Sequence, residues 1–245
     1  MLFKIGIFEV RYYGLVYVFT FLLVYYLFNK NRDEFNMDSK EVEEFVFYLM
    51  IGLLIGARLM HFLINQPSVF WTRPWELLMV WHGGMSFFGA LLGIITAGYY
   101  FAKKHKFSFW KAADLAVLPA TFGIGLGRIA NLINQELVGT VSSVPWCFDF
   151  AGYLGCRHPY QLYGALSHFI LFGLLVYLYK NKKKDGSVFT LFLMLYSVFR
   201  FITDFFRVDP RWFGLTSWQY MSVALFFVGL YLFYKSINSI TKARV

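Results

Sequence analysis

Charged residues are scarce in this sequence. They make up 15% of its 245 residues, whereas 58% are hydrophobic and 22% are aromatic, with 30 Phe and 17 Tyr. Soluble domains carry about 25% charged residues, so the composition excludes an ordinary soluble domain and favours a lipid bilayer. The first apolar run has neither a basic stretch before it nor a small-residue cleavage site after it. We therefore interpret it as a retained span rather than a cleaved signal.

Cysteine is rare as well. Cys147 and Cys156 are too few for a disulfide scaffold or a four-ligand zinc site. No motif for a metal or a nucleotide is present, so no cofactor is expected. The net charge of +9 would suggest nucleic acid in a soluble protein. Here the basic residues lie in short loops between apolar runs, where membrane topology explains them, and we expect no nucleic-acid partner.

Seven apolar runs are long enough to cross a bilayer, whose hydrocarbon core of about 30 Å requires roughly 20 helical residues. They lie at about 11–29, 42–65, 82–102, 112–138, 160–180, 187–207 and 217–236. The expected fold is an all-α polytopic membrane protein with seven transmembrane helices. It forms one transmembrane domain over residues 1–245, with its longest connections at about 66–81 and 139–159.

The distribution of Lys and Arg predicts the orientation. One set of flanks carries 14 of them and the other set carries 5, and the richer set faces the cytoplasm. The N-terminus is then outside, the C-terminus is cytoplasmic, and both long connections face outward. Because oxidation is permitted there, we predict a disulfide between Cys147 and Cys156. Two unpaired thiols remain the alternative, since sequence does not give bridging geometry.

Four further arginines, Arg58, Arg128, Arg200 and Arg207, lie inside or at the edge of the apolar runs. An arginine at a helix centre costs at least about 2.5–3.5 kcal/mol, so each is a functional candidate. At 1.5 Å per residue, Arg58 lies about 24 Å and Arg200 about 20 Å above the cytoplasmic ends of their helices. The sequence therefore predicts a gathering of cations in the outer third of the membrane.

Two acids, Glu136 and Asp204, are expected at the same level, so four positive charges would face two negative ones. This surplus and the bidentate guanidinium fork suit a phosphodiester headgroup. Helical spacing predicts two polar stripes, Tyr196-Arg200-Asp204-Arg207 and Arg128-Asn131-Gln135-Glu136. The alternative is that these groups only lock the bundle through ion pairs and hydrogen bonds. For Arg58 alone we favour that alternative or a side chain that snorkels to the outer interface, and for Arg128 with Arg200 we favour an anion site.

Pairs of glycines four residues apart occur in three of the runs. They are Gly52 with Gly56, Gly89 with Gly93, and Gly123 with Gly127. This spacing lets helix backbones approach closely, so it predicts close helix packing.

One segment resembles the signature of the prolipoprotein diacylglyceryl transferase family: Gly127-Arg128-Ile129-Ala130-Asn131-Leu132-Ile133-Asn134-Gln135-Glu136-Leu137-Val138-Gly139. Similar pieces follow the family's order over nearly the whole chain, among them Tyr13-Gly14, Gly83-Gly84-Met85-Ser86-Phe87, Arg157-His158-Pro159 and Asp204-Phe205-Phe206-Arg207. The resemblance implies a seven-span plasma-membrane enzyme with its active site toward the outer leaflet. Such enzymes transfer the diacylglyceryl group of phosphatidylglycerol to the lipobox cysteine thiol of a preprolipoprotein. They release glycerol phosphate in the first step of lipoprotein maturation.

The resemblance implies roles for the matching residues Tyr13, Arg128, Asn131, Glu136, Gly139, Arg200 and Asp204. The chemistry agrees, because negative charge grows on the departing phosphate, where Arg128 and Arg200 would stabilise it. Asn131 and Tyr13 would orient headgroup hydroxyl or ester oxygens, while Glu136 and Asp204 would hold the arginine forks. Arg58, Tyr196 and Arg207 complete the candidate substrate-binding residues.

The chain departs from the family where a histidine, a favoured general base, usually follows Met-Ser-Phe. Here Phe88 takes that place. Four interpretations compete: His82 replaces it, His61 replaces it, no protein base is needed, or the chain is inactive or uses another acceptor. We rank the absence of a protein base just ahead of His82. The rival function is that of a non-catalytic membrane protein that binds anionic lipid, such as a transporter.

Overall fold

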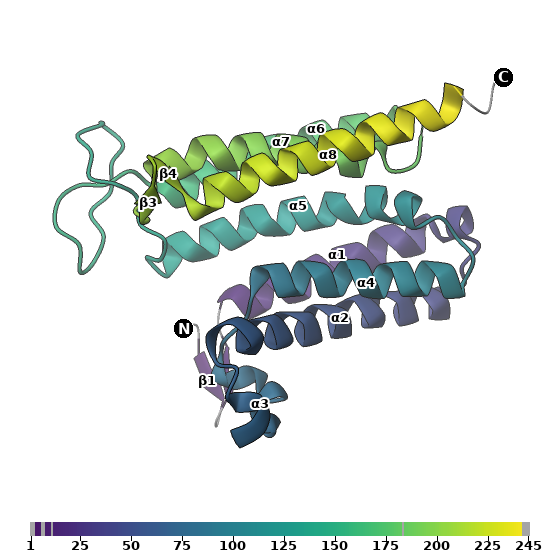
Figure 1. Cartoon of the computed structure of the whole chain (residues 1–245), viewed down its shortest axis with the longest axis horizontal. Helices are drawn as coiled ribbons and strands as arrows, with labels where there is room; N and C mark the ends of the chain where they lie inside the picture. The colour runs from purple at the N-terminus through teal and green to yellow at the C-terminus, as the bar shows by residue number, and fades with distance from the viewer. Residues whose placement is uncertain (1–2, 6–7, 11, 183, 242–245) are drawn as a thin grey trace. The chain divides into compact units, whose positions relative to one another are not determined.

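The computed structural model describes residues 3–5, 8–10, 12–182 and 184–241 and is built almost entirely of helices (Figure 1). The long helices are α1 (Tyr12–Lys30), α2 (Ser39–Asn65), α4 (Phe87–Lys104), α5 (Phe109–Ile133), α6 (Tyr160–Lys180), α7 (Ser187–Thr203) and α8 (Ser217–Thr241). Shorter helical segments are η1 (Arg32–Phe35), α3 (Val69–Thr72), η2 (Pro74–Leu77), η3 (Val80–His82) and η4 (Asp204–Phe206). Strands β1 (Phe3–Ile5) and β2 (Phe8–Val10) form one two-stranded sheet, and β3 (Arg211–Trp212) and β4 (Leu215–Thr216) form another.

Six of the described helices are long and apolar enough to cross a membrane: α1, α2, α5, α6, α7 with its η4 extension, and α8. Their surfaces carry large exposed apolar side chains such as Leu22, Phe47 and Tyr231, which suit contact with lipid rather than water. The chain is therefore a polytopic membrane protein. Helix α4, predicted as a seventh span, has only 18 residues, two of them the terminal Lys103 and Lys104, and is not among the six.

The chain forms two compact units. Unit 2 comprises residues 5–8 and 21–112, and within it α2 packs along α4 (Figure 1). A Cβ on Gly56 would collide with the carbonyl oxygen of Gly89, and one on Gly93 with that of Gly52. The two backbones are in direct contact at these positions, as the spacing of the glycines predicts.

Aromatic side chains form the core at the end of unit 2 where α1 leads into α2. The Phe45 ring lies 4.8 Å from that of Phe28 and 5.2 Å from that of Phe101, centroid to centroid. Phe35 and Phe107 close the cluster with an edge-to-face contact at 5.7 Å. Such tilted and edge-to-face arrangements are the favourable geometries for aromatic pairs.

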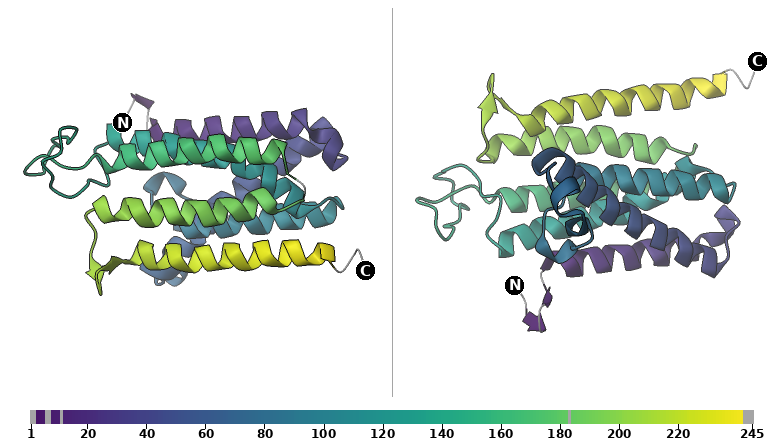
Figure 2. Two further views of the ribbon diagram at one scale, coloured as in Figure 1. Left: turned by 90° about the horizontal axis from the view of Figure 1, so that it is seen from above. Right: turned by 60° about the horizontal axis from the view of Figure 1, so that its bottom comes forward.

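Unit 1 comprises residues 1–4, 9–20 and 113–245. Within it α7 lies beside both α6 and α8 (Figure 2). The carboxylate of Asp114, fully buried on α5, accepts hydrogen bonds from the backbone N–H groups of Gly186 at 2.9 Å and Phe189 at 2.8 Å. These are two of the N–H groups that a helix leaves unpaired at its start, so Asp114 caps α7 from a neighbouring helix.

Two helices of unit 1 end earlier than the sequence predicts. Helix α5 stops at Ile133, because Gln135 and Leu137 adopt left-handed φ values of 54° and 56°. Gln135 and Glu136 therefore do not continue a polar stripe on that helix. Helix α7 ends at Thr203 and η4 follows, so Arg207 has an extended backbone instead of standing on the predicted helical stripe.

Candidate active site

Three arginines of unit 1 gather around two aromatic rings. The guanidinium carbons of Arg128 and Arg207 each lie 5.7 Å from the centroid of the Tyr160 ring. Those of Arg200 and Arg207 lie 5.3 and 5.9 Å from the centroid of the Trp218 ring. Cations over aromatic faces at this range are attracted by the ring quadrupole. Four segments of the chain, α5, α6, α7 with the residues after η4, and the start of α8, thus bring these cations together.

Carboxylates pair with two of the three arginines. Fully buried Asp204 lies 3.3 Å from Nε of Arg200, and its Oδ1 also accepts a hydrogen bond of 2.8 Å from the Tyr160 hydroxyl. Asp209 lies 3.0 Å from Nε of Arg207. Burial raises the pKa of Asp209 above its usual value, and the charge of Arg207 opposes that shift.

Arg128 differs from the other two arginines of this cluster. Within the part of the chain that the structure describes, its guanidinium forms no hydrogen bond and no ion pair; it lies over the Tyr160 ring, and the side chain passes over Gly164. Near this cluster lie the carboxylates of Asp204 and Asp209, and the surplus of charge expected from sequence, which includes Arg58 of unit 2, stays a prediction. What distinguishes this cluster is one guanidinium that lacks a carboxylate partner among the described residues.

A second polar group joins Tyr13, Asn131 and Glu136. The Tyr13 hydroxyl donates to the Glu136 carboxylate, and the Asn131 amide donates to the Tyr13 hydroxyl. The same amide lies 3.3 Å from Oε2 of Glu136. Tyr13 stands at the start of α1, more than a hundred residues from its two partners. The fold therefore brings together three of the residues singled out from sequence.

The turn after α5 places Glu136 in this group. Its backbone N–H donates to the carbonyl of Asn131 at 2.9 Å, which folds the chain back on the helix end. The buried side chain of Gln161 on α6 then donates to the Glu136 carbonyl at 2.6 Å. Glu136 thus reaches Tyr13 because the helix has ended, not because it continues.

Gly139 lies where three backbone segments cross. It forms an isolated β-bridge with Arg207, and a Cβ on it would collide with the His158 carbonyl oxygen and lie 2.9 Å from that of Phe206. No side chain fits there. The glycine therefore allows the connection between α5 and α6 to pack against the segment that carries Arg207.

Tyr196 lies on α7 one helical turn before Arg200. Its ring contacts those of Phe192 at 5.5 Å and of the buried His168 on α6 at 5.6 Å. Tyr196 was predicted to bind substrate, and the structure places it among aromatic neighbours next to the arginine cluster.

Arg58 and His82 belong to unit 2 and are described there alone. The buried Arg58 guanidinium donates to the backbone carbonyls of Glu76, Leu77, Gly83 and Gly84. Its donors hold the connection after α2. His82 Nδ1 lies 2.8 Å from Oε2 of Glu76, and both line a pocket of about 600 Å³ with Arg58 and His61.

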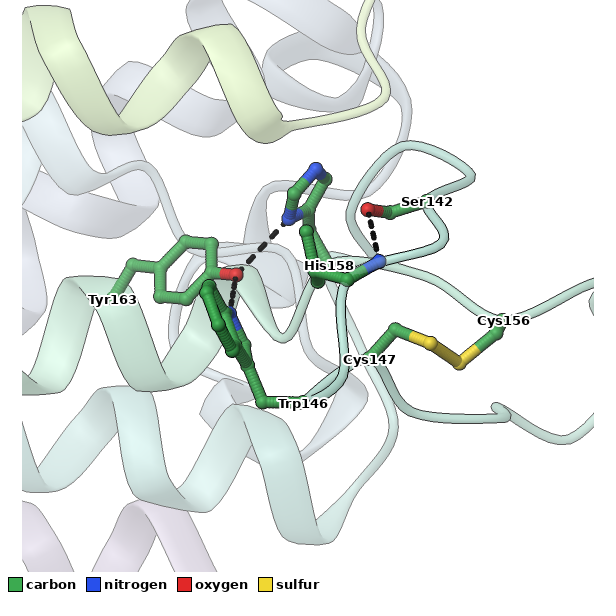
Figure 3. Close-up of a disulfide and its surroundings, with 7 residues drawn as sticks. Ser142, Trp146, Cys147, Cys156, His158 and Tyr163 are labelled. Carbon is green, nitrogen blue, oxygen red and sulfur yellow. Dashed lines mark hydrogen bonds between the residues drawn. A yellow bond between two sulfur atoms is a disulfide. The ribbon is translucent and has the colours of Figure 1, made fainter.

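The connection between α5 and α6, residues 134–159, contains a disulfide between Cys147 and Cys156 (Figure 3). Next to it, Trp146 donates a 2.8 Å hydrogen bond to the Tyr163 hydroxyl, which also lies 3.0 Å from Nδ1 of His158 (Figure 3). The connection is thus tied both to itself and to the first turn of α6.

The sequence did not single out Tyr160, Trp218 or Asp209 as site residues. Tyr160 directly follows the motif Arg157-His158-Pro159, so its position was a usable signal. Among the described residues, no three His, Cys, Asp or Glu side chains are grouped in a way that could hold a metal ion.

These features define a polytopic membrane protein with a cluster of guanidinium groups embedded between its helices. Residues 1–235 match the family described as prolipoprotein diacylglyceryl transferase, and the chain belongs to this family, which makes it a transferase. Relatives named phosphatidylglycerol–prolipoprotein diacylglyceryl transferase include one from Geobacter sulfurreducens, 38% identical over 93% of this chain and 91% of its own. Another from Pasteurella multocida is 40% identical over 91% of this chain and 84% of its own. The family resemblance drawn from the motifs is confirmed.

Proposed function

We propose that this chain transfers the diacylglyceryl group of phosphatidylglycerol to the lipobox cysteine thiol of a preprolipoprotein and releases glycerol phosphate. Family membership supports the transfer reaction, and the names of the relatives give the lipid and the prolipoprotein as substrates. The observation that ties the reaction to a site is Arg128, a guanidinium without a carboxylate partner among the described residues, beside Arg200 and Arg207.

The cluster suits the leaving group of this reaction. Sulfur forms a bond to the glyceryl carbon while the bond from that carbon to the phosphate oxygen breaks, and its electron pair leaves with the phosphate. Arg128 supplies donors that no acceptor among the described residues occupies, and Arg200 is held by Asp204 at 3.3 Å. Donors fixed in advance in a site with little water stabilise such growing charge at no cost of reorganisation.

The remaining candidates take supporting roles. Tyr13, Asn131 and Glu136 form one hydrogen-bonded group that would orient headgroup hydroxyl or ester oxygens. Gly139 keeps Arg207 in register, and Tyr196 packs beside the cluster.

The thiol proton must leave as well, and Phe88 is no base. We favour solvent and the arginine field as the means of forming the thiolate, with His82 as the alternative. His82→Ala tests that alternative: full transfer activity in this variant would remove His82 from consideration.

The transfer reaction is tested with purified protein, headgroup-labelled phosphatidylglycerol and a lipobox peptide. We expect labelled glycerol phosphate and a thioether-linked peptide. The transfer rate of Arg128→Ala should be lower by about 10²–10³ because the guanidinium is lost. Arg128→Lys should be slowed to the same extent, because lysine keeps the charge but not the planar fork. Arg211→Ala is the matched control, since Arg211 is exposed and contacts neither Tyr160 nor Trp218. No release by the parent protein, with lipid still bound, would favour the non-catalytic function.

We also propose that the N-terminus is outside, the C-terminus is cytoplasmic, and the active site lies toward the outer leaflet of the plasma membrane. The excess of Lys and Arg on one set of flanks supports this orientation, as does a disulfide in the 139–159 connection. Intact cells treated with a membrane-impermeant reductant and then a membrane-impermeant maleimide should label Cys147 and Cys156. Labelling that requires cell lysis contradicts the orientation.

A further inference from the structure

His168 is a buried histidine on α6, 4% exposed, for which the transfer reaction has no stated use. Its Nδ1 lies 2.6 Å from the carbonyl oxygen of Gly164. A carbonyl only accepts, so Nδ1 carries a proton, and the neutral ring then presents a lone pair at Nε2. That Nε2 is buried, and among the described residues it has no hydrogen-bond partner.

The ring lies next to the arginine cluster. Tyr160, Gly164 and His168 are four residues apart and share one face of α6. A Cβ on Gly164 would lie 3.1 Å from Cδ of Arg128, so the Arg128 side chain passes directly over this face. The His168 ring also meets the Tyr196 ring edge to face at 5.6 Å.

A charge on the imidazole is unfavourable because the ring is buried between helices. A proton on Nε2 would also add a cation close to the Arg128 side chain, which passes over Gly164 one helical turn away. Nε2 is therefore suited to accept a hydrogen bond rather than to hold a proton. Its burial without a donor is unfavourable, so a ligand that brings a donor is favoured there.

We propose that Nε2 of His168 accepts a hydrogen bond from a hydroxyl group on the headgroup whose phosphate binds Arg128, and so selects a polyol phospholipid. The inference rests on the proposed function, because it takes the lipid site to be the arginine cluster. Residues four apart on a helix lie roughly 5–6 Å apart, a separation that a glycerol headgroup spans from its phosphate to its hydroxyls. A headgroup without hydroxyls would leave Nε2 unpaired.

The test compares binding of phosphatidylglycerol with binding of phosphatidylpropanol, which has the same phosphodiester charge and no headgroup hydroxyl. The parent protein in nanodiscs should prefer phosphatidylglycerol by about five- to tenfold, the worth of one hydrogen bond. His168→Phe keeps a ring against Tyr196 and should lose this preference by weakening only phosphatidylglycerol binding. His168→Gln, which keeps an acceptor near the Nε2 position, should retain most of it.

Ser167→Ala is the matched control, because Ser167 also bonds to the Gly164 carbonyl but leaves Nε2 in place, so the preference should be unchanged. Equal weakening of both lipids by His168→Phe would show a packing role and overturn the inference, as would a parent protein without any preference. A fall in kcat at constant KM would assign His168 to proton transfer instead. If His168→Phe does not fold, the parent and His168→Gln measurements still decide.

Failure of this inference and failure of the proposed function are distinct outcomes. Binding is measured without an acceptor peptide, so a His168-dependent preference without transfer leaves the inference standing and removes the transferase assignment. Transfer activity together with an unchanged lipid preference in His168→Phe overturns the inference and leaves the transferase assignment standing.

Discussion

The guanidinium groups of this chain differ in what they contact. Arg58 gives its donors to four backbone carbonyls and stabilises the connection after α2. Arg200 is held by a buried carboxylate. Arg128 has only an aromatic ring as a partner among the described residues. A guanidinium whose donors are already bonded stabilises structure, whereas one with free donors is available to an anionic ligand.

Gly139 gives the clearest prediction at this scale. Gly139→Ala would push a Cβ into the His158 carbonyl, so we expect a loss of stability of about 1–3 kcal/mol, the usual cost of overpacking. The thermal unfolding midpoint in detergent measures it. Gly173→Ala is the control, since nothing lies within 4 Å of a Cβ on Gly173 in α6. Equal midpoints for both variants would contradict the close approach at Gly139.

At the scale of elements, the ends of the helices decide where several polar side chains lie. The end of α5 at Ile133 turns Glu136 back toward Tyr13, and the end of α7 sends Arg207 into an extended segment beside Gly139. The start of α7 depends on the buried carboxylate of Asp114. The turns at these ends place the side chains at positions that a continued regular helix would not reach.

Replacing the cap tests this dependence. Asp114→Ala leaves the N–H groups of Gly186 and Phe189 and the Lys182 ammonium at 3.4 Å without their buried acceptor. We expect a loss of about 1–3 kcal/mol, seen as a lower unfolding midpoint. The exposed Asp185, which lies 3.8 Å from the same lysine, provides the control Asp185→Ala, expected to change little. A larger effect at Asp185 would refute the cap.

At the scale of the whole molecule, the chain forms two compact units. Unit 1 contains the arginine cluster and the Tyr13 group, whereas unit 2 contains Arg58, His82 and the pocket they line. The single transmembrane domain expected from sequence stays a prediction.

The number of crossings depends on α4. If α4 spans the membrane, as the seven-span interpretation requires, the connections at residues 36 and 106 lie on the same, cytoplasmic side. We expect this because Lys103, Lys104, Lys106 and Lys111 flank the second of these connections. Reporter enzymes fused after Asn36 and after Lys106 should therefore both be active in the cytoplasm. Opposite compartments for the two reporters would leave α4 outside the set of spans.

Local patterns were sufficient for much of this protein. Apolar runs predicted the six helices that are long and apolar enough to span a membrane. Glycines four apart predicted close helix packing, and the run from Gly127 to Gly139 indicated the family. Each of these signals is carried by residues close together in sequence, because hydrophobic periodicity and the spacing of small residues are local patterns.

Contacts between distant residues needed the folded chain. Tyr13 is hydrogen-bonded to Glu136, 123 positions away. The arginines of three segments lie over the rings of Tyr160 and Trp218. Arg58 donates hydrogen bonds to backbone carbonyls. No periodicity encodes which helices become neighbours, or where a helix ends and its polar side chains turn. The arginines within the apolar runs could therefore be identified from the sequence. Tertiary packing decided that Arg128, alone among the three clustered arginines, has no carboxylate partner among the described residues.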